Sequence, residues 1–362
     1  MPELRTDWLT GRSIIVAENR ALRPNEYAAQ ETAAKTGAQT VANLALAEVG
    51  LPDVPGVPSC PFCVGNESQT PPALYEWRDA EGRWQVRVVP NMFPAVIPED
   101  CPLFWPTDAI GRTGNEQEKG TVPWEGSTPA RGAHEVIIES ARHVDRASAL
   151  SPQELRQVLE AYAHRLRHWR DDGRFGYGLV FKNQGPRAGA SIAHLHSQFI
   201  ALPDVPPAVD AEMRRAEHDY RRHQACPYCR LIERERSLGE RIVSDRNGYV
   251  AFCPFASLQP HEIWLLPDHH EPALEQVSSP DASARLADVL QPLLERLELI
   301  VPDAAYNMLL RTAPWRVDCD NWCHWRIELI PRVNAFSGFE IATGVHINPL
   351  APERAARQLR ST

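Results

Sequence analysis

Two histidines one residue apart, His194 and His196, are the side chains in this sequence best suited to chemistry. Neutral imidazole is well populated near neutral pH, so it is a competent nucleophile at phosphorus. Its attack would give a covalent phosphoramidate and divide one displacement into two. Because alternate residues of a strand face the same side, His194 can bind a metal ion while His196 faces a ligand. Another interpretation is that both histidines bind one metal ion and neither reacts.

The loop before these histidines has the composition of a phosphate-binding loop. Gly185 and Gly189 permit close approach of the backbone to a phosphate, and Arg187 lies between them. Ser191 and Gln198 are uncharged donors that can hold phosphoryl oxygens. Phosphoryl transfer also needs in-line positioning and stabilisation of charge on those oxygens. The stretch therefore predicts a nucleophile at His196 with donors nearby in the sequence.

One pattern of cysteines and histidines occurs twice. The first set consists of Cys60, Cys63, His143 and His194, and the second of Cys226, Cys229, His270 and His324. In both copies a His-Glu pair, beginning at His134 or His261, opens an apolar run, and packing at the start of a strand is the expected role of these histidines. Where the first copy continues to His196, the second has Arg326. The asymmetry predicts two modules of common design and one active site.

Each set fits a structural zinc site, which closes four tetrahedral positions with nitrogen and sulfur ligands. Two thiolates and two neutral imidazoles balance the charge of the cation, so such a site can be buried. The alternatives are a thioredoxin-like redox pair, or cysteines that are simply buried. A redox pair would need a βαβ context, which the sequence does not show. We expect zinc at the first set; at the second, His269, Cys319 and Cys323 compete for coordination.

Length and composition indicate a globular protein with two domains. The 362 residues are 43% hydrophobic and 23% charged. A net charge of −9 argues against a nucleic-acid partner, although a few local arginines suffice for small phosphorylated ligands. The sequence lacks a signal-peptide pattern and a run of about 18 apolar residues, which predicts a cytoplasmic protein without a membrane partner. In a reducing compartment, Cys-x-x-Cys pairs are more typical of metal ligands than of disulfides.

Hydrophobic periodicity predicts the same order of strands and helices in both modules. In the first we expect a helix after the capping box of Ser151 and Glu154, and strands at 13–17, 84–89, 177–181 and 194–198. In the second we expect helices at 209–224, 281–299 and from 352, and strands at 249–252, 262–266, 306–310 and 324–330. Residues 203–207 are typical of a linker, and 101–131 of a long mobile insertion loop. The order predicts an α+β fold with antiparallel sheets, divided into modules 1–205 and 206–362.

The active-site stretch resembles that of the galactose-1-phosphate uridylyltransferases, a branch of the histidine-triad superfamily. The residues that carry the resemblance are Asn183, Gly185, Gly189, Ser191, His194, His196 and Gln198. Further similar elements span nearly the whole chain: the Arg-x-x-Arg-Pro element of Arg20 and Arg23, the zinc pair Cys60 and Cys63, the nucleotide loop at Asn91, the third zinc ligand His143, and a sugar-site element at Glu340. The resemblance implies two fused histidine-triad domains in one subunit.

It also implies roles for individual residues. His196 would carry the nucleotidyl group, with Ser191 and Gln198 on the α-phosphate. Asn91 and Asn183 would lie near the nucleotide, and the loop of Arg20 and Arg23 near phosphate.

The sequence departs from this family's pattern in three places. Leu195 and Ser197 replace the usual Pro and Gly around the second histidine of the His-x-His motif. Glu328 and Ile330 stand where the family has a second His-x-His, and the Cys226 set is more similar to the ADP-glucose phosphorylase branch. His346 stands in place of a Gln that recognises the sugar.

The sequence therefore predicts a zinc-containing nucleotidylyltransferase with a ping-pong mechanism. It would move UMP from a nucleotide sugar to a sugar 1-phosphate through His196, because the nucleophile and the phosphate donors are kept in spite of the three departures. Two alternatives stay open: a phosphorylase that passes AMP from ADP-glucose to inorganic phosphate, and a zinc-stabilised nucleotide-binding protein without catalysis. The resemblance also implies a homodimer.

Overall fold

The computed structural model describes residues 2–6, 13–17, 20, 60–98, 127–276 and 280–362. Arg23, the cysteine at position 101 and most of the predicted 101–131 insertion lie outside these residues. The described part forms a mixed fold of α-helices and antiparallel sheets, as predicted. Within it, no helix combines the length and the apolar character needed to cross a membrane.

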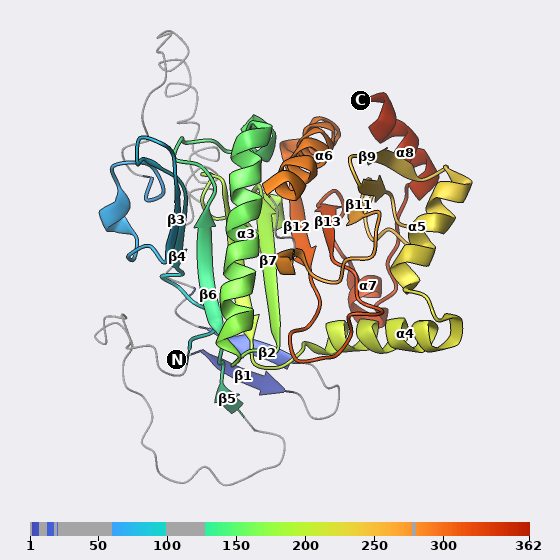
Figure 1. Ribbon diagram of the computed structural model, residues 1–362, viewed down its shortest axis with the longest axis horizontal. Coiled ribbons are helices and arrows are strands. Elements are labelled where there is room, and N and C mark those ends of the chain that lie inside the picture. The colour runs from blue at the N-terminus through green and yellow to red at the C-terminus, as the bar shows by residue number, and fades with distance from the viewer. Residues whose placement is uncertain (1, 7–12, 18–19, 21–59, 99–126, 277–279) are drawn as a thin grey trace.

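A ten-stranded sheet runs through the molecule (Figure 1), and every strand pairs with its neighbours in antiparallel fashion. Its order is β3-β4-β6-β8-β7-β12-β13-β11-β10-β9. The first five strands precede residue 205 and are Tyr75–Arg78, Trp84–Pro90, Ala133–Ile138, His196–Leu202 and Tyr177–Gln184. The other five follow it and are Tyr306–Arg311, Arg326–Pro331, Ile263–Pro267, Tyr249–Phe252 and Ile242–Arg246. The halves meet where β7 pairs with β12 and Asn183 lies opposite Asn307.

A second sheet of three strands lies near the N-terminus. Strand β1 (Glu3–Thr6) pairs with β2 (Ser13–Val16) on one side and β5 (Ser127–Pro129) on the other. The prediction of a loop over 101–131 is therefore wrong for its last residues. Because the edge of β1 offers ladder hydrogen bonds, residues 127–129 become a strand in spite of their polar, Pro-containing sequence.

Two long helices cover one face of the large sheet and lie side by side (Figure 1). Helix α3 (Pro152–Asp172) starts at the predicted capping box, in which Ser151 and Glu154 satisfy each other's backbone N–H groups, and it ends at Gly173 with φ 76°. Helix α6 (Pro280–Ile300) occupies the same position over the second half. The apolar stripes of both helices join the strand residues below them in one continuous core.

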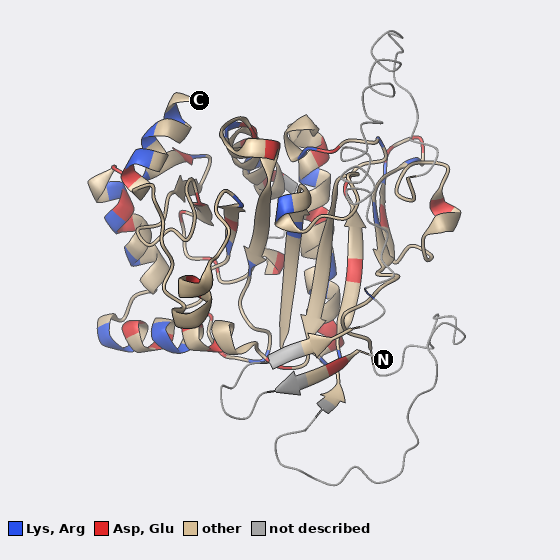
Figure 2. Cartoon of the chain, turned by 180° about the vertical axis from the view of Figure 1, so that it is seen from behind, with Lys and Arg blue, Asp and Glu red and all other residues tan. Residues whose placement is uncertain are grey.

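Four further helices belong to the second half: α4 (Pro207–His223), α5 (Pro227–Leu238), α7 (Gly338–Thr343) and α8 (Pro352–Ser361). Helices α4 and α8 were predicted, whereas α5 and α7 were not. Helix α5 is difficult to predict because its sequence is polar. Its first turn begins inside the Cys226–Cys229 pair, with Pro227 at the first position. Figure 2 shows the sheet from the side opposite α3, where none of the described α-helices lies over the central strands.

Alternation of side chains along β6 decides which of its residues reach that open face. Glu135 points toward α3, where its carboxylate accepts from Arg165 at 2.6 Å and from Trp169 Nε1 at 2.7 Å. Since side chains alternate along a strand, His134 and Val136 point to the opposite face. The open face therefore carries the candidate site.

Candidate active site and metal clusters

His196 is the first residue of β8 and lies opposite Ile138 of β6. Its Nδ1 is 2.8 Å from the backbone carbonyl oxygen of His194. A carbonyl oxygen only accepts, so Nδ1 carries the hydrogen and Nε2 keeps its lone pair. The fold thus holds His196 in the tautomer that can act as a nucleophile through Nε2. The strand prediction for residues 194–198 is wrong at its start, because His194 precedes β8.

Phe62 connects this histidine with the cysteine loop. Its ring lies edge-on to His196 at 5.3 Å and to His194 at 6.0 Å between centroids. Both histidines therefore face the Cys60–Cys63 loop, but strand alternation is not the reason, because only His196 is part of the strand. The contact places the candidate nucleophile one ring away from the first cysteine–histidine set.

The first set forms one compact cluster. Potential ligand atoms of Cys60, Cys63, His143 and His194 all lie within 4.8 Å of one another. His194 Nδ1 is 3.5 Å from each thiol sulfur, and His143 Nδ1 is 3.3 Å from Cys63 Sγ. His194 Nε2 donates to the carbonyl oxygen of Ser140 at 2.9 Å, so the lone pair of its Nδ1 points into the cluster. Burial lowers the pKa of His194 to about 4, which keeps this imidazole neutral.

These distances fit a tetrahedral metal ion better than a set of hydrogen bonds. With Zn–S of about 2.3 Å and Zn–N of about 2.0 Å, a tetrahedral centre holds sulfur and nitrogen about 3.5 Å apart. The backbone acceptor on the distal nitrogen of His194 is the support that metal-bound histidines ordinarily have. The cluster is therefore able to hold a metal ion such as Zn²⁺.

The second set has the same arrangement but is more exposed. Cys226, Cys229, His270 and His324 also place their ligand atoms within 4.8 Å of one another. Cys229 Sγ lies 3.7 Å from His270 Nδ1 and 3.8 Å from His324 Nδ1. The distal nitrogens donate to backbone carbonyls, His270 to Asp320 at 2.6 Å and His324 to Pro267 at 3.1 Å. A hydrogen bond from Cys229 lowers the pKa of the Cys226 thiol to about 4, which favours a thiolate there.

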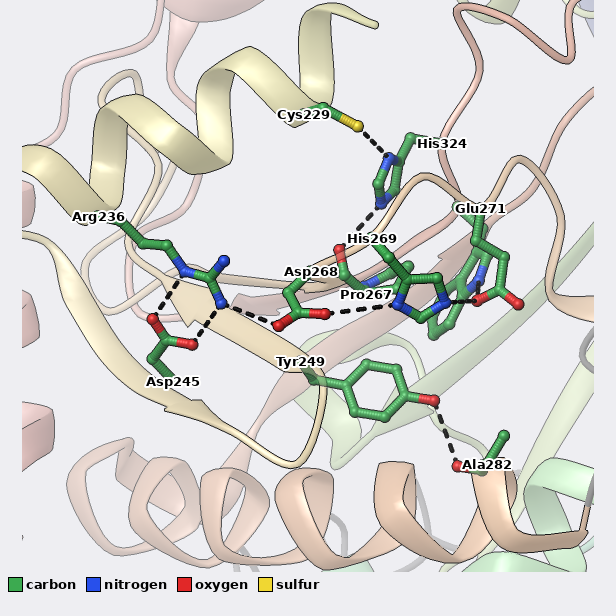
Figure 3. Close-up of polar contacts among 11 residues, drawn as sticks. Cys229, Arg236, Asp245, Tyr249, Pro267, Asp268, His269, Glu271, Ala282 and His324 are labelled. Atoms are coloured by element: carbon green, nitrogen blue, oxygen red, sulfur yellow. Dashed lines mark hydrogen bonds and ion pairs between the residues drawn. The ribbon is translucent and has the colours of Figure 1, made fainter.

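The structure excludes the three competitors for this second cluster. Cys319 and Cys323 are joined to each other as a disulfide. His269 points away from the cysteines and lies between Asp268, at 3.4 Å, and Glu271, at 3.7 Å (Figure 3). In the same view the His324 ring lies between Cys229 Sγ and the Pro267 carbonyl.

The predicted phosphate loop follows β7. Gly185 and Gly189 adopt φ of 75° and 93°, which favour glycine, and enclose a single turn of 3-10 helix, Pro186–Ala188. Asn307 of β12 donates its amide Nδ2 to Ala188 O at 3.0 Å and to Asn183 Oδ1 at 2.8 Å. The second half of the chain thereby orients Asn183 in the loop of the first half. Arg187 donates to the Val333 carbonyl at 2.7 Å.

Gln198 is the second residue after the nucleophile and faces the same side of β8. Its Oε1 lies 3.0 Å from Nε2 of His134. Asn91 approaches the same nitrogen of His134 at 3.0 Å. His134 therefore joins Asn91 and Gln198, two residues implied by the family resemblance, whereas the sequence predicted only a packing role for it. The available signal was alternation along β6, which places His134 and Val136 on the face of His196.

Other predicted site residues are more dispersed. Arg20 donates to the Phe93 carbonyl at 3.0 Å and so lies beside the Asn91 loop. Ser191 is buried in the segment between the glycine loop and β8. Glu340 bonds to Ser337 in the capping box of α7, and the ring of His346 lies 4.7 Å from that of Phe336. Neither of these last two contacts involves the His196 site.

The second half holds an ion-pair network at the corresponding strand positions. Arg326 begins β13 as His196 begins β8, and Glu328 follows it as Gln198 does. Arg326 pairs with Glu328 at 2.6 Å and with Glu212 of α4 at 2.8 Å, and Arg311 lies 3.4 Å from Glu328. We call Glu212, Arg311, Arg326 and Glu328 the mirror cluster.

Strand register corrects one pairing made from the sequence. Val136 lies opposite Gln198, and Trp264 lies opposite Glu328. Two residues before Val136 is His134, and two residues before Trp264 is Glu262. The residue of the second half that corresponds to His134 is therefore Glu262 and not His261. His261 stands outside the strand with φ 62° and bonds to Gln358 of α8 at 2.7 Å. The loop before β11 shifts the sequence pattern by one residue relative to the sheet.

Comparisons with known proteins agree with this architecture. The N-terminal domain of galactose-1-phosphate uridyl transferase matches residues 1–206, and a domain of unknown function, DUF4921, matches residues 115–361. An ADP-glucose phosphorylase of Arabidopsis thaliana is 31% identical over 99% of this chain and 92% of its own length. A galactose-1-phosphate uridylyltransferase of Thermotoga maritima is 26% identical over 86% of this chain and 92% of its own length.

Solved structures show the same relationship. An ADP-glucose phosphorylase from Arabidopsis thaliana with bound ADP-glucose is 28% identical, with a TM-score of 0.70 over 100% of this chain and 99% of that one. A uridylyltransferase structure is 26% identical, with a TM-score of 0.71 over 99% and 97%. Fold and site together define an enzyme of the nucleotidyltransferase class. The chain belongs to the galactose-1-phosphate uridyl transferase family, with features of its ADP-glucose phosphorylase branch.

Proposed function

We propose that this protein transfers a nucleoside monophosphate from a nucleoside diphosphate sugar to a phosphate-bearing acceptor, through a covalent intermediate on His196. The observation that carries the proposal is the 2.8 Å hydrogen bond from His196 Nδ1 to the His194 carbonyl. It leaves the Nε2 lone pair as the nucleophile without the need for a separate general base. Family membership supports the same reaction class.

In the first step, Nε2 attacks the α-phosphorus and the bond from this phosphorus to the bridging oxygen breaks. The sugar 1-phosphate leaves with the electron pair of that bond. In the second step, a phosphate oxygen of the acceptor attacks the same phosphorus and Nε2 departs with its lone pair restored. Donors at Ser191, Gln198 and the Gly185–Gly189 loop would stabilise the charge on the α-phosphoryl oxygens.

We also propose roles for the other predicted contact residues. We propose that Asn91 and Asn183 bind the nucleotide, that Arg20 and Arg23 lie near phosphate with Arg187, and that Glu340 and His346 contribute to sugar recognition. Division into modules 1–205 and 206–362 is proposed on the same basis, since five strands of the large sheet come from each side of that boundary.

Two acceptors are consistent with this site. A uridylyltransferase would pass UMP to a sugar 1-phosphate, and a phosphorylase would pass AMP from ADP-glucose to inorganic phosphate. The second form is favoured by the relative that spans 99% of the chain, which is an ADP-glucose phosphorylase. The Cys226 cluster also sets this chain apart from the His-x-His pattern of uridylyltransferases.

We propose Zn²⁺ at both cysteine–histidine clusters. Each would hold the ion with two sulfurs and two Nδ1 atoms and would be closed to substrates, so that the ion ties a loop to the sheet. In the first cluster this would fix His194, whose carbonyl orients His196. Zinc content, measured by plasma mass spectrometry, should fall from about two ions per chain to about one in both Cys60→Ser and Cys226→Ser. Unchanged content in either variant would contradict a zinc site there.

The test of the reaction is intact-protein mass spectrometry after mixing with UDP-glucose, ADP-glucose or a GDP-sugar, each without acceptor. A mass increase of one nucleoside monophosphate is expected, and its size names the base. His196→Gly should form no adduct while it keeps its zinc and melting temperature. Adding glucose 1-phosphate or inorganic phosphate to the isolated adduct then identifies the acceptor. Absence of an adduct with every donor would refute the proposed intermediate.

We also propose a homodimer. The segment after β13 exposes large apolar side chains, among them Ile341 at 71% and Ile347 at 61%. Exposed apolar patches of this kind often mark protein interfaces. Light scattering coupled to gel filtration should give twice the monomer mass, and a monomer at micromolar concentration would contradict the proposal. A cytoplasmic location stays a prediction.

A further inference from the structure

His134 is a buried imidazole whose two nitrogens are both engaged. Nδ1 lies 3.0 Å from the backbone nitrogen of Ala95, and Nε2 lies 3.0 Å from Gln198 Oε1. The residue is 6% exposed and sits on β6, next to the strand that begins with His196. It thus lies inside the candidate site and contacts Gln198, which is two residues after the nucleophile on the same face of β8.

Polarity along this chain of contacts follows from the backbone group at one end. A peptide N–H can only donate, so the Ala95 amide requires Nδ1 of His134 to accept. A neutral imidazole then carries its hydrogen on Nε2. Asn91 Nδ2, 3.0 Å from that nitrogen, is itself a donor and cannot accept this hydrogen. The acceptor is therefore Gln198 Oε1.

The hydrogen bond from His134 also fixes the position of the other end of the Gln198 amide. An amide has one oxygen and one NH₂ group, and without a fixed partner it can turn by 180° and exchange them. With Oε1 held by His134, the NH₂ group is the end that points away from this histidine. A phosphoryl oxygen only accepts, so the NH₂ end is the one that can bind it.

We infer that His134 is a positioning residue for nucleotidyl transfer, which presents the NH₂ group of Gln198 to the phosphoryl group at His196. The inference rests on the proposed function and adds a component to it: His134 touches no reacting atom and acts through Gln198. The second half differs at both positions: Glu262 occupies the position of His134 and Glu328 that of Gln198, and neither side chain has an NH₂ group to offer a phosphoryl oxygen.

The first test needs no substrate. Long-range proton–nitrogen NMR of the histidine-labelled protein, assigned with His134→Gln, should show Nδ1 without a hydrogen and Nε2 with one. The opposite tautomer, or a charged ring at neutral pH, would overturn the inference. Because this measurement does not depend on turnover, it separates failure of the inference from failure of the proposed function, which would appear as a wild-type protein without adduct.

The second test is a double-mutant cycle on the rate of adduct formation. His134→Phe keeps the ring shape but donates nothing, and should slow the adduct by roughly 10- to 100-fold, less than losing an oxyanion donor outright. His134→Gln retains an N–H near the place of Nε2 and should restore most of the rate. In the Gln198→Leu background, His134→Phe should have almost no further effect.

A matched control completes this experiment. His164→Phe makes the same change at a histidine of α3 that stacks on Tyr75, 4.1 Å away, and should leave the adduct rate unchanged. Full additivity of His134→Phe and Gln198→Leu, or equal losses in the Phe and Gln variants of His134, would show a merely structural role and overturn the inference.

Discussion

The two halves of the large sheet place opposite kinds of side chain at the same strand positions. In the first half, His196, Gln198 and Asn183 carry imidazole and amide groups that can form hydrogen bonds. In the second, the corresponding residues Arg326, Glu328 and Arg311 form a buried ion-pair network with Glu212. Rings of Trp264 and Tyr228 also lie within 4.5 and 5.5 Å of the Arg326 guanidinium carbon.

This difference shows what makes one of two similar scaffolds a candidate for catalysis. Both halves have a cysteine–histidine cluster directly before the strand, and both have histidine tautomers set by backbone carbonyls. In the mirror cluster, however, α4 covers the strand and the charges satisfy one another. In the first half, none of the described α-helices covers the face that carries His196 and Gln198. The halves therefore differ in the chemistry of these side chains and in whether a helix covers them, whereas both have a cysteine–histidine cluster.

The largest expected effect comes from exchanging the first residue of the two strands. His196→Arg should reduce adduct formation by roughly 10⁴-fold or more, since no nucleophile remains. Zinc content should stay the same, because His194 and the cysteines are untouched. The reciprocal Arg326→His should produce no adduct at residue 326, as peptide mapping would show. An adduct there would break the comparison by showing a second competent site.

The second-largest expected effect concerns the mirror cluster, which is a buried network of ion pairs. Arg326→Met leaves Glu212 and Glu328 without their main partner and should lower the free energy of unfolding by about 3–5 kcal/mol in urea titrations. Arg214→Met is the control. The Arg214–Asp210 pair lies on α4, the helix that carries Glu212, but it is exposed and should contribute little to stability. Equal stability of the two variants would mean that the network does not hold the second half together.

The third effect concerns pH. Burial and the nearby charge of Glu328 raise the pKa of Glu262 from 4.5 to about 7. The folded state therefore binds more protons than the unfolded state between these values. The stability from this group is full below pH 4.5 and is lost as the pH rises through about 7, a change of roughly 3 kcal/mol.

Glu262→Gln should remove that decline, so that the difference in melting temperature between variant and wild type grows in favour of the variant from pH 5 to pH 8. Since His134 occupies the equivalent position in the first half, His134→Gln is the matched change there. Parallel curves for wild type and Glu262→Gln would show that the carboxyl does not titrate in this range.

The smallest expected effect tests how the second half supports the first. Asn307→Asp places carboxylate oxygens against Ala188 O and Asn183 Oδ1, so Asn183 should turn its oxygen toward the ligand. The dissociation constant of the donor, measured by calorimetry on the His196→Gly background, should rise by about tenfold. Asn307→Ala removes the bonds without reversing polarity and should weaken binding less. Equal affinities would exclude a role for Asn307 in orienting Asn183.

Residue types and spacing predicted the elements near the candidate site well. The capping box at Ser151, the strands on either side of the glycine loop, and both four-residue cysteine–histidine clusters are present in the structure. They could be predicted because each depends on local periodicity or on residue types that have few other uses. Helices α5 and α7 were missed because short polar helices have weak periodicity.

Errors in the site came from contacts between distant segments. His134 is buried at the start of β6, as predicted, but the sequence did not show its contacts with Ala95 and Gln198, which lie 39 and 64 residues away. His261 was paired with His134 because the sequence pattern matched, whereas the strand register substitutes Glu262. His269 competed with His270 until the fold placed it between Asp268 and Glu271.

The sequence by itself determined the chemical inventory of this protein: a repeated set of two cysteines and two histidines, and a single His196 after a glycine loop. The tertiary structure alone decided the state of these groups. Tautomers, amide orientations and the choice between ligand and ion pair all depend on which backbone donor or acceptor lies opposite a side chain. Apart from the His194 carbonyl beside His196, those groups come from segments distant in the sequence, and only the folded chain brings them within hydrogen-bonding distance.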